Sequence, residues 1–165
     1  MCQTAIEGGF KYLFMLDSDV IPPRDAVLRL MSRNLPIVSG LYCRRSPPHG
    51  VPVAQKGGQW VTQFAHGSCF EVDVVGAGCL LIRRDVLEAV AKNPQRPGHV
   101  WFDWRVNYQG LRPREECMSE DFTFNLHAKK LGFPTYLDTS VVCRHVGLAS
   151  ATYASFVPCE ATPHT

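Results

Sequence analysis

The sequence lacks a strong excess of charge of either sign. Its 165 residues carry a formal net charge of +2, so no strong global field attracts nucleic acid or an anionic membrane. No apolar run is long enough to span a bilayer. The N-terminus also lacks the basic segment and following apolar stretch of a secretory signal peptide. We therefore expect a cytoplasmic protein that binds no nucleic acid and has no membrane span.

Short cysteine spacings are absent as well. The seven cysteines lie at positions 2, 43, 69, 79, 117, 143 and 159, without a C-x-x-C pair or a short metal-ligand spacing. Their number is odd, and Cys79 and Cys143 lie inside apolar runs. We interpret the cysteines as small core residues of a protein in a reducing compartment.

What the sequence does contain is an apolar run that ends in two carboxylates. The run from Tyr12 to Leu16 has no polar alternation, and Asp17-Ser18-Asp19 follows it directly. Such a run is typical of a strand that is covered on both faces, as in a parallel sheet, and ligands collect at the carboxyl ends of these strands. The pattern predicts that Asp17 and Asp19 bind a hard divalent cation. The structural alternative is a turn that the two side chains stabilise by hydrogen bonds.

The rest of the chain alternates between helical and strand-like segments. The patterns predict helices at 2–7, 24–33, 85–91 and after Ser119, and a hairpin around Gly57-Gly58. The length and the 45% hydrophobic content fit a single core. We expect residues 1–148 to form an α/β domain with a mixed, largely parallel central sheet flanked by helices. Residues 149–165 lack periodicity and are expected to form an irregular tail.

Several motifs follow one another in a characteristic order. They are Asp17-Ser18-Asp19, Gly76-Ala77-Gly78 before an apolar strand, Trp101-Phe102, Ser119-Glu120-Asp121 and Arg144-His145-Val146-Gly147. This ordered set resembles the catalytic half of a glycosyltransferase with the GT-A fold, most closely the inverting family 2 enzymes. The resemblance implies a metal-dependent transfer of a sugar from a nucleotide-diphosphate-sugar donor to a carbohydrate or other hydroxyl acceptor, with inversion.

The resemblance also implies roles for individual residues. Asp19 and His145 would bind Mn²⁺ or Mg²⁺, and Asp17 would contact the ribose or a water molecule on the metal. Asp121, at a helix N-terminus, would be the base that takes the proton from the acceptor hydroxyl, and Glu120 would touch one of the sugars. For His145 the alternative is a structural histidine, and for Asp121 it is the usual preference for acidic residues in a first helical turn.

Two further segments would line the sugar pocket. Gly76, Ala77 and Gly78 would let the backbone approach the donor closely, and Trp101 and Phe102 would stack on the apolar faces of sugars. The structural alternatives are a β-bulge for the glycine segment and core packing for the aromatic pair.

The chain begins after the region that holds the nucleotide base in this family. The resemblance therefore implies a catalytic domain that is incomplete at its N-terminus. A partner would supply the missing half, or the open sheet edge would favour a homo-oligomer. Two other functions stay open. One is a degenerate transferase domain that acts as a non-catalytic binding module. The other is a phosphatase of the haloacid dehalogenase type, with Asp17 as nucleophile and Asp19 handling the proton.

Overall fold

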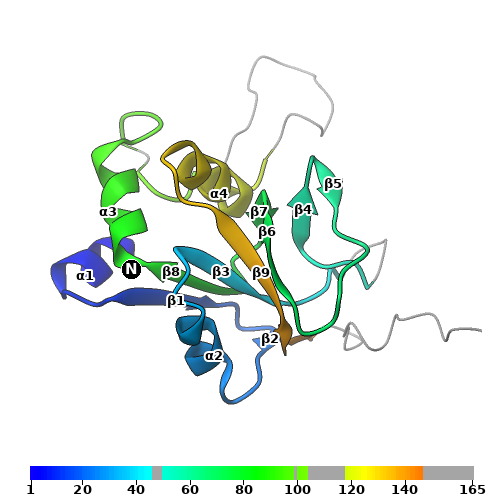
Figure 1. Cartoon of the computed structure of the whole chain (residues 1–165). Coiled ribbons are helices and arrows are strands. Elements are labelled where there is room, and N and C mark those ends of the chain that lie inside the picture. Colours follow the sequence, from blue (N-terminus) through cyan, green and yellow to red (C-terminus); the bar gives the residue numbers. More distant parts are fainter. Residues whose placement is uncertain (46–49, 99, 104–117, 147–165) are drawn as a thin grey trace, which may run out of the picture.

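A five-stranded sheet forms the centre of the protein (Figure 1). The computed structural model describes residues 1–45, 50–98, 100–103 and 118–146, so the tail expected at 149–165 lies outside the described residues. The strands of this sheet, in spatial order, are β1 (Tyr12–Leu16), β8 (Cys79–Arg83), β3 (Ile37–Leu41), β9 (Thr135–Val142) and β6 (Cys69–Val72).

The expected strand directions are confirmed only in part. The sheet is mixed, but β3 and β9 form the one parallel pair among its described strands. The pairs β1–β8, β3–β8 and β6–β9 are antiparallel, so a largely parallel sheet was the wrong prediction. β3 and β8 are buried on both faces, and burial removes the polar alternation whichever way the neighbouring strand runs. The run from Tyr12 to Leu16 is only half-buried, so its expected cover on both faces was wrong.

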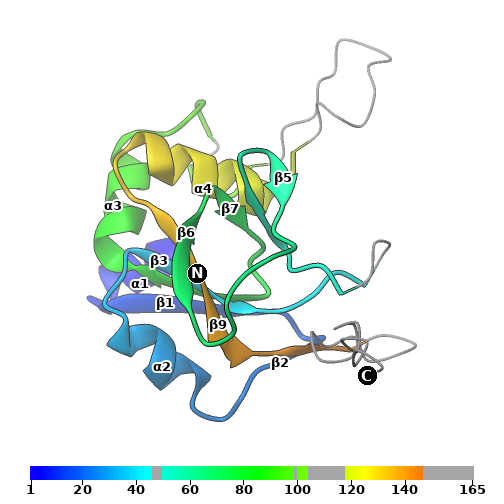
Figure 2. The same ribbon diagram turned by 45° about the vertical axis from the view of Figure 1, so that its right-hand side comes forward.

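Helices cover both faces of this sheet (Figures 1 and 2). They are α1 (Cys2–Glu7), α2 (Ala26–Ser32), α3 (Arg84–Lys92) and α4 (Glu120–Lys130). α1, α3 and α4 share a core with Leu80 and Ile82 of β8, whereas α2 packs with Leu81 on the opposite face. No helix in the described residues is long and apolar enough to cross a membrane.

Two small sheets complete the fold. One contains β5 (Gln59–Trp60), β4 (Ala54–Lys56) and β7 (Val74–Val75), and the other pairs β2 (Val20–Ile21) with β10 (Arg144–His145). The segment 70–75, which alternates like a single strand, is therefore divided between two sheets. The division falls at Asp73, whose carboxylate forms an ion pair with Lys129 of α4.

The strand that leads to the two aspartates lies at an edge of the central sheet. β1 pairs with β8 on one side, and within the described residues no strand pairs with its other side. Large apolar side chains are exposed at both of its ends, with Phe10 61% and Leu16 46% exposed. Assembly through this edge, with a second copy or with a partner chain, stays a prediction.

Candidate functional site

The turn after β1 lies beside the glycine segment. The backbone N–H of Asp17 donates to the carbonyl of Gly78 at 3.1 Å, one step beyond the pairing of Leu16 with Cys79. The chain then turns, and the N–H of Val20 donates to the carbonyl of Asp17 at 3.1 Å. Asp17 and Asp19 therefore stand at the end of a strand whose neighbour β8 follows directly on the glycine segment.

His145 reaches the same turn from the other end of the chain. β10 pairs with β2 so that His145 lies opposite Val20, and the N–H of Val146 donates to the Asp19 carbonyl at 2.7 Å. The imidazole Nε2 lies 3.6 Å from Asp19 Oδ2. This pairing is long-range, and it brings together two of the three side chains that the sequence proposed as metal ligands, Asp19 and His145.

The other ring nitrogen of His145 determines what Nε2 can do. Nδ1 lies 2.7 Å from the carbonyl oxygen of Cys43, which can only accept, so Nδ1 carries a proton. In the neutral imidazole the lone pair is then on Nε2, which lies 3.6 Å from Asp19 Oδ2. An imidazole nitrogen and a carboxylate oxygen are both ligands that divalent cations accept.

Asp121 joins this group through the glycine segment. Ser119 is the N-cap of α4, as predicted, and its hydroxyl accepts from the N–H of Phe122. Asp121 Oδ2 accepts a hydrogen bond from the N–H of Ala77 at 3.1 Å. Asn125, one turn later and fully buried, donates to the carbonyls of Val75 and Asp121. The first turn of α4 is thereby held against the segment that precedes β8.

The buried face of α4 consists of Phe124, Asn125 and Ala128, together with Thr123. Asn125 is a polar residue on this buried face. Thr135 donates to the Asn125 side-chain oxygen at 2.9 Å, and these hydrogen bonds offset the cost of burying the amide.

The glycines beside Ala77 make room for Tyr42. A Cβ atom at Gly76 would lie 2.0 Å from the Tyr42 hydroxyl oxygen, and one at Gly78 would lie 2.7 Å from the ring. The N–H of Gly78 donates to this hydroxyl at 3.0 Å, and the ring meets His145 edge-on with centroids 5.5 Å apart. Tyr42 therefore connects the glycine segment with His145. The sequence contained no sign of this role, because an aromatic residue at the end of an apolar strand is usually a core residue.

Negative charge is in excess around the turn after β1. Burial raises the pKa of Asp17, and the carboxylates of Asp19 and Asp121 raise it further, against smaller opposing effects of His145 and Arg45. Arg45 Nη1 forms an ion pair with Asp19 Oδ2 at 2.8 Å. The carboxylates of Asp19 and Asp121 thus lie close enough to repel that of Asp17, and His145 and Arg45 offset this repulsion in part.

Glu120 adds a further acidic group. Burial raises its pKa, with contributions from Asp121 and Asp17. Its Oε2 atom is buried and has no hydrogen-bond partner in the described part of the chain. A buried oxygen without a partner costs free energy, which a bound sugar hydroxyl or cation would recover.

Trp101 and Phe102 make their contacts with the core. The rings of Phe102 and Phe124 stack with centroids 4.5 Å apart, and Trp101 Nε1 donates to the carbonyl of Leu87 at 3.2 Å. Both side chains are half-buried. These contacts match core packing, the structural alternative for this pair, and sugar stacking by either ring stays a prediction.

The side chains near Asp19 are only partly suited to bind a metal ion. Among the described residues, no group of three or more His, Cys, Asp or Glu side chains is arranged to hold a metal ion. Asp19 and His145 approach each other, but the guanidinium of Arg45 occupies the same Asp19 oxygen. The carboxylate oxygens and the imidazole suit Mn²⁺ or Mg²⁺, and Arg45 would have to leave Asp19 for a cation to bind there.

The repulsion at Asp17 predicts a pH-dependent gain in stability for Asp17→Asn in metal-free buffer. A raised pKa means that the folded protein keeps this proton to higher pH than the unfolded chain does. The ionised carboxylate therefore costs stability at neutral pH, and the cost disappears as the pH falls toward the ordinary aspartate value of 3.8. We expect the melting temperature of the variant at pH 7 to be higher by on the order of 1–2 °C. The expected gain is small because solvent screens the charge of this exposed group.

Melting temperatures of both proteins from pH 3.5 to 7 measure this difference. Asp25→Asn is the matched control, because Asp25 pairs with Arg29 on the surface and its loss should give no such gain. A gain for Asp17→Asn that is the same at every pH would contradict the electrostatic cause.

Comparisons with known proteins bear on the fold. No protein-family model matches the chain, and no curated protein matches it. Among solved structures, the chain is similar to the crystal structure of A197 from STIV, with a TM-score of 0.57 and 18% sequence identity. The match covers 99% of this chain and 77% of that one. A likeness at this identity shows a shared fold and leaves the activity open.

Proposed function

We propose that the protein is a glycosyltransferase that moves a sugar from a nucleotide-diphosphate-sugar donor to a hydroxyl acceptor with inversion. The observation that carries the proposal is the meeting of Asp17, Asp19, Asp121 and His145. Backbone pairing brings His145 to Asp19, and the Ala77 N–H holds Asp121 next to the residue that pairs with Asp17. The order of the motifs along the chain and this convergence support the same chemistry.

In this proposal Asp19 and His145 would hold a divalent cation, which would supply positive charge to offset the departing diphosphate. Asp121 accepts the proton of the acceptor hydroxyl, and that oxygen attacks the anomeric carbon on the face opposite to the diphosphate. The bond from the anomeric carbon to the diphosphate oxygen breaks, and its electron pair leaves with the nucleoside diphosphate. The hydrogen bond from the Ala77 N–H holds the Asp121 carboxylate in its orientation.

Arg45 has a second role in this proposal. Its guanidinium pairs with Asp19 and also donates to the carbonyl of Val146 at 3.4 Å. If a cation bound at Asp19, the guanidinium would be free to bind a phosphate oxygen of the donor. Arg45 would then neutralise the carboxylate in the absence of substrate and recognise the diphosphate in its presence.

A thermal-shift screen of nucleotide-diphosphate sugars, each with and without Mn²⁺, tests the proposal. Binding to the folded state raises the melting temperature, and a ligand at 100 times its Kd should raise it by about 5 °C or more in a chain of this size. Mn²⁺ alone, the same sugars with EDTA, and nucleoside monophosphates are the controls. If no nucleotide sugar stabilises the protein more with Mn²⁺ than without it, the proposal is wrong.

A further inference from the structure

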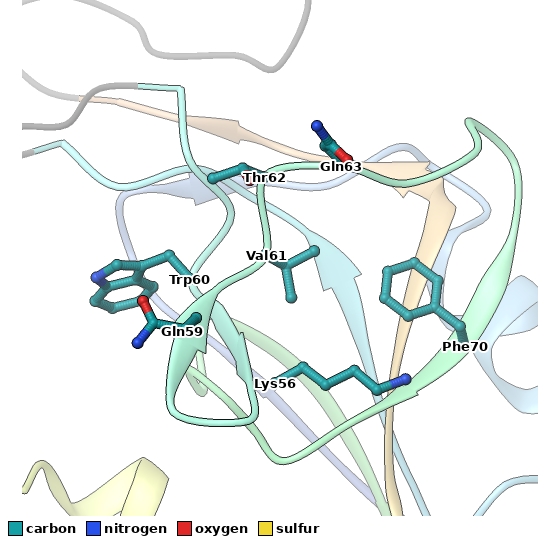
Figure 3. Close-up of a pocket in the computed structure, with 7 residues that line it drawn as sticks. All are labelled: Lys56, Gln59, Trp60, Val61, Thr62, Gln63 and Phe70. Atoms are coloured by element: carbon teal, nitrogen blue, oxygen red, sulfur yellow. The ribbon is translucent and has the colours of Figure 1, made fainter.

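A pocket of about 330 Å³ lies against the β4–β5 hairpin, and none of the carboxylates described above lines it. Figure 3 shows six of the residues that line it: Lys56, Gln59, Trp60, Val61, Gln63 and Phe70. Its volume is at the lower end of the range for small-molecule sites. The sequence indicated the hairpin around Gly57-Gly58 but gave no sign of a pocket beside it.

The hairpin that forms the pocket is anchored to the rest of the fold. Its turn consists of Gly57 and Gly58, both with positive φ (60° and 75°), as a tight two-residue turn requires. The N–H of Gly57 donates to the Asp73 carboxylate, which also pairs with Lys129 of α4. The pocket wall is therefore held in place by the helix that carries Asp121.

One side of the hairpin adjoins the candidate site. The ring of Trp60 lies 6.1 Å from that of Phe122, the residue after Asp121. The guanidinium of Arg44 lies over the Trp60 ring at 4.4 Å, and the next residue, Arg45, pairs with Asp19. Trp60 thus stands between the pocket and the group of carboxylates.

The other side of the hairpin faces the pocket. In Figure 3, Val61 and Phe70 point toward each other, Lys56 extends along one end, and Gln63 lies at the opposite end. Val61 is buried, and Phe70 is half-buried, whereas Lys56 and Gln63 are exposed. The ring of Phe70 stacks on Phe64 with centroids 6.3 Å apart. The pocket therefore has an apolar floor and a polar rim.

The apolar floor and the polar rim of the pocket are complementary to a sugar ring. Amide groups both donate and accept hydrogen bonds, as neighbouring sugar hydroxyls do, and the apolar floor suits the C–H face of the ring. The residues that line the pocket include Lys56 but no carboxylate. The exposed ammonium group of Lys56 can form a charge-assisted hydrogen bond with a sugar carboxylate, such as that of a uronic acid.

We propose that this pocket is a subsite for a saccharide acceptor, with a preference for a uronic acid over a neutral sugar. Its role as an acceptor subsite rests on the proposed glycosyl transfer, whereas saccharide binding can be measured by itself. In this arrangement the sugar in the pocket extends past Trp60, so that the next unit of the acceptor presents its hydroxyl to Asp121.

Titration of the ¹⁵N-labelled protein with glucose, galactose, mannose, N-acetylglucosamine and glucuronic acid tests the inference by NMR. We expect shifts of the backbone amides at 56–63 and at Phe70, with the tightest binding for glucuronic acid. Gln63→Ala should weaken binding of every sugar by about threefold to tenfold, because it removes hydrogen bonds at an exposed position. Lys56→Met should abolish the preference for glucuronic acid over glucose.

Matched variants control for unspecific effects. Gln3→Ala and Lys130→Met remove the same functional groups from exposed positions on α1 and α4 and should leave sugar binding unchanged. If no sugar shifts the hairpin amides, or the Gln63 and Lys56 variants bind as the wild type does, the inference is wrong. Metal-dependent binding of a nucleotide sugar would survive that result. Conversely, sugar binding at the hairpin without nucleotide-sugar binding would retain the pocket and refute the transferase.

Discussion

Asp121→Asn is expected to lower the rate of sugar transfer by about 10²- to 10⁴-fold while donor binding stays unchanged. An asparagine oxygen can still accept the hydrogen bond from the Ala77 N–H, so the first turn of α4 keeps its position. The amide has no useful affinity for a proton and cannot activate the acceptor hydroxyl. The measurement is release of the nucleoside diphosphate from the nucleotide sugar selected by thermal shift, with an acceptor or with water.

The control for this variant is Asp85→Asn. Asp85 also lies in the first turn of a helix, α3, but it pairs with Arg83. Its loss removes an acidic group from a helix N-terminus without touching the proposed base. Turnover close to that of the wild type in Asp121→Asn would remove Asp121 from the mechanism, whatever the Asp85 variant does.

Asp19→Asn is expected to weaken Mn²⁺-dependent binding of the nucleotide by at least about 100-fold. The variant loses the charged oxygen that faces both His145 and Arg45. Isothermal titration with the nucleoside diphosphate and Mn²⁺ measures the effect. Unchanged affinity would refute Asp19 as a metal ligand.

A second variant separates metal binding from simple loss of the ion pair. Arg45→Met breaks the same 2.8 Å contact with Asp19 but leaves the carboxylate in place. If the cation competes with Arg45, this variant should bind Mn²⁺ alone more tightly than the wild type does. If Asp19 has only a structural role, both variants should change binding in the same direction. Opposite effects therefore support the metal site.

Local patterns in the sequence predicted the elements that depend on neighbouring residues. Ser119 at the start of α4 and Gly57-Gly58 in the hairpin turn lie where the patterns indicated. In both cases the signal is a short-range requirement, a hydrogen bond to a free N–H or a positive φ. The directions of the strands could not be predicted in the same way, because they depend on which distant segment lies alongside.

The residues of the candidate site also fall into two groups, those that the sequence indicated and those that it did not. The order of motifs singled out Asp17, Asp19, Asp121 and His145. In the structure His145 lies beside Asp19, and Asp121 contacts Ala77, the neighbour of the residue that pairs with Asp17. The sequence did not indicate that the Tyr42 side chain contacts both the glycine segment and His145. It also did not indicate that Asn125 anchors α4, the helix that contains Asp121. Both residues act through contacts across the sheet, for which the sequence holds no local sign.

The sequence by itself determined where strands and helices begin and which carboxylates follow them, because these features depend on hydrophobicity and backbone preference over a few residues. Only the tertiary structure decided that β10 would lie beside β2 and that α4 would point its first turn at Ala77. Burial and pairing between remote segments set these positions. The distances among the carboxylates, His145 and Arg45, on which any chemistry depends, follow from that packing.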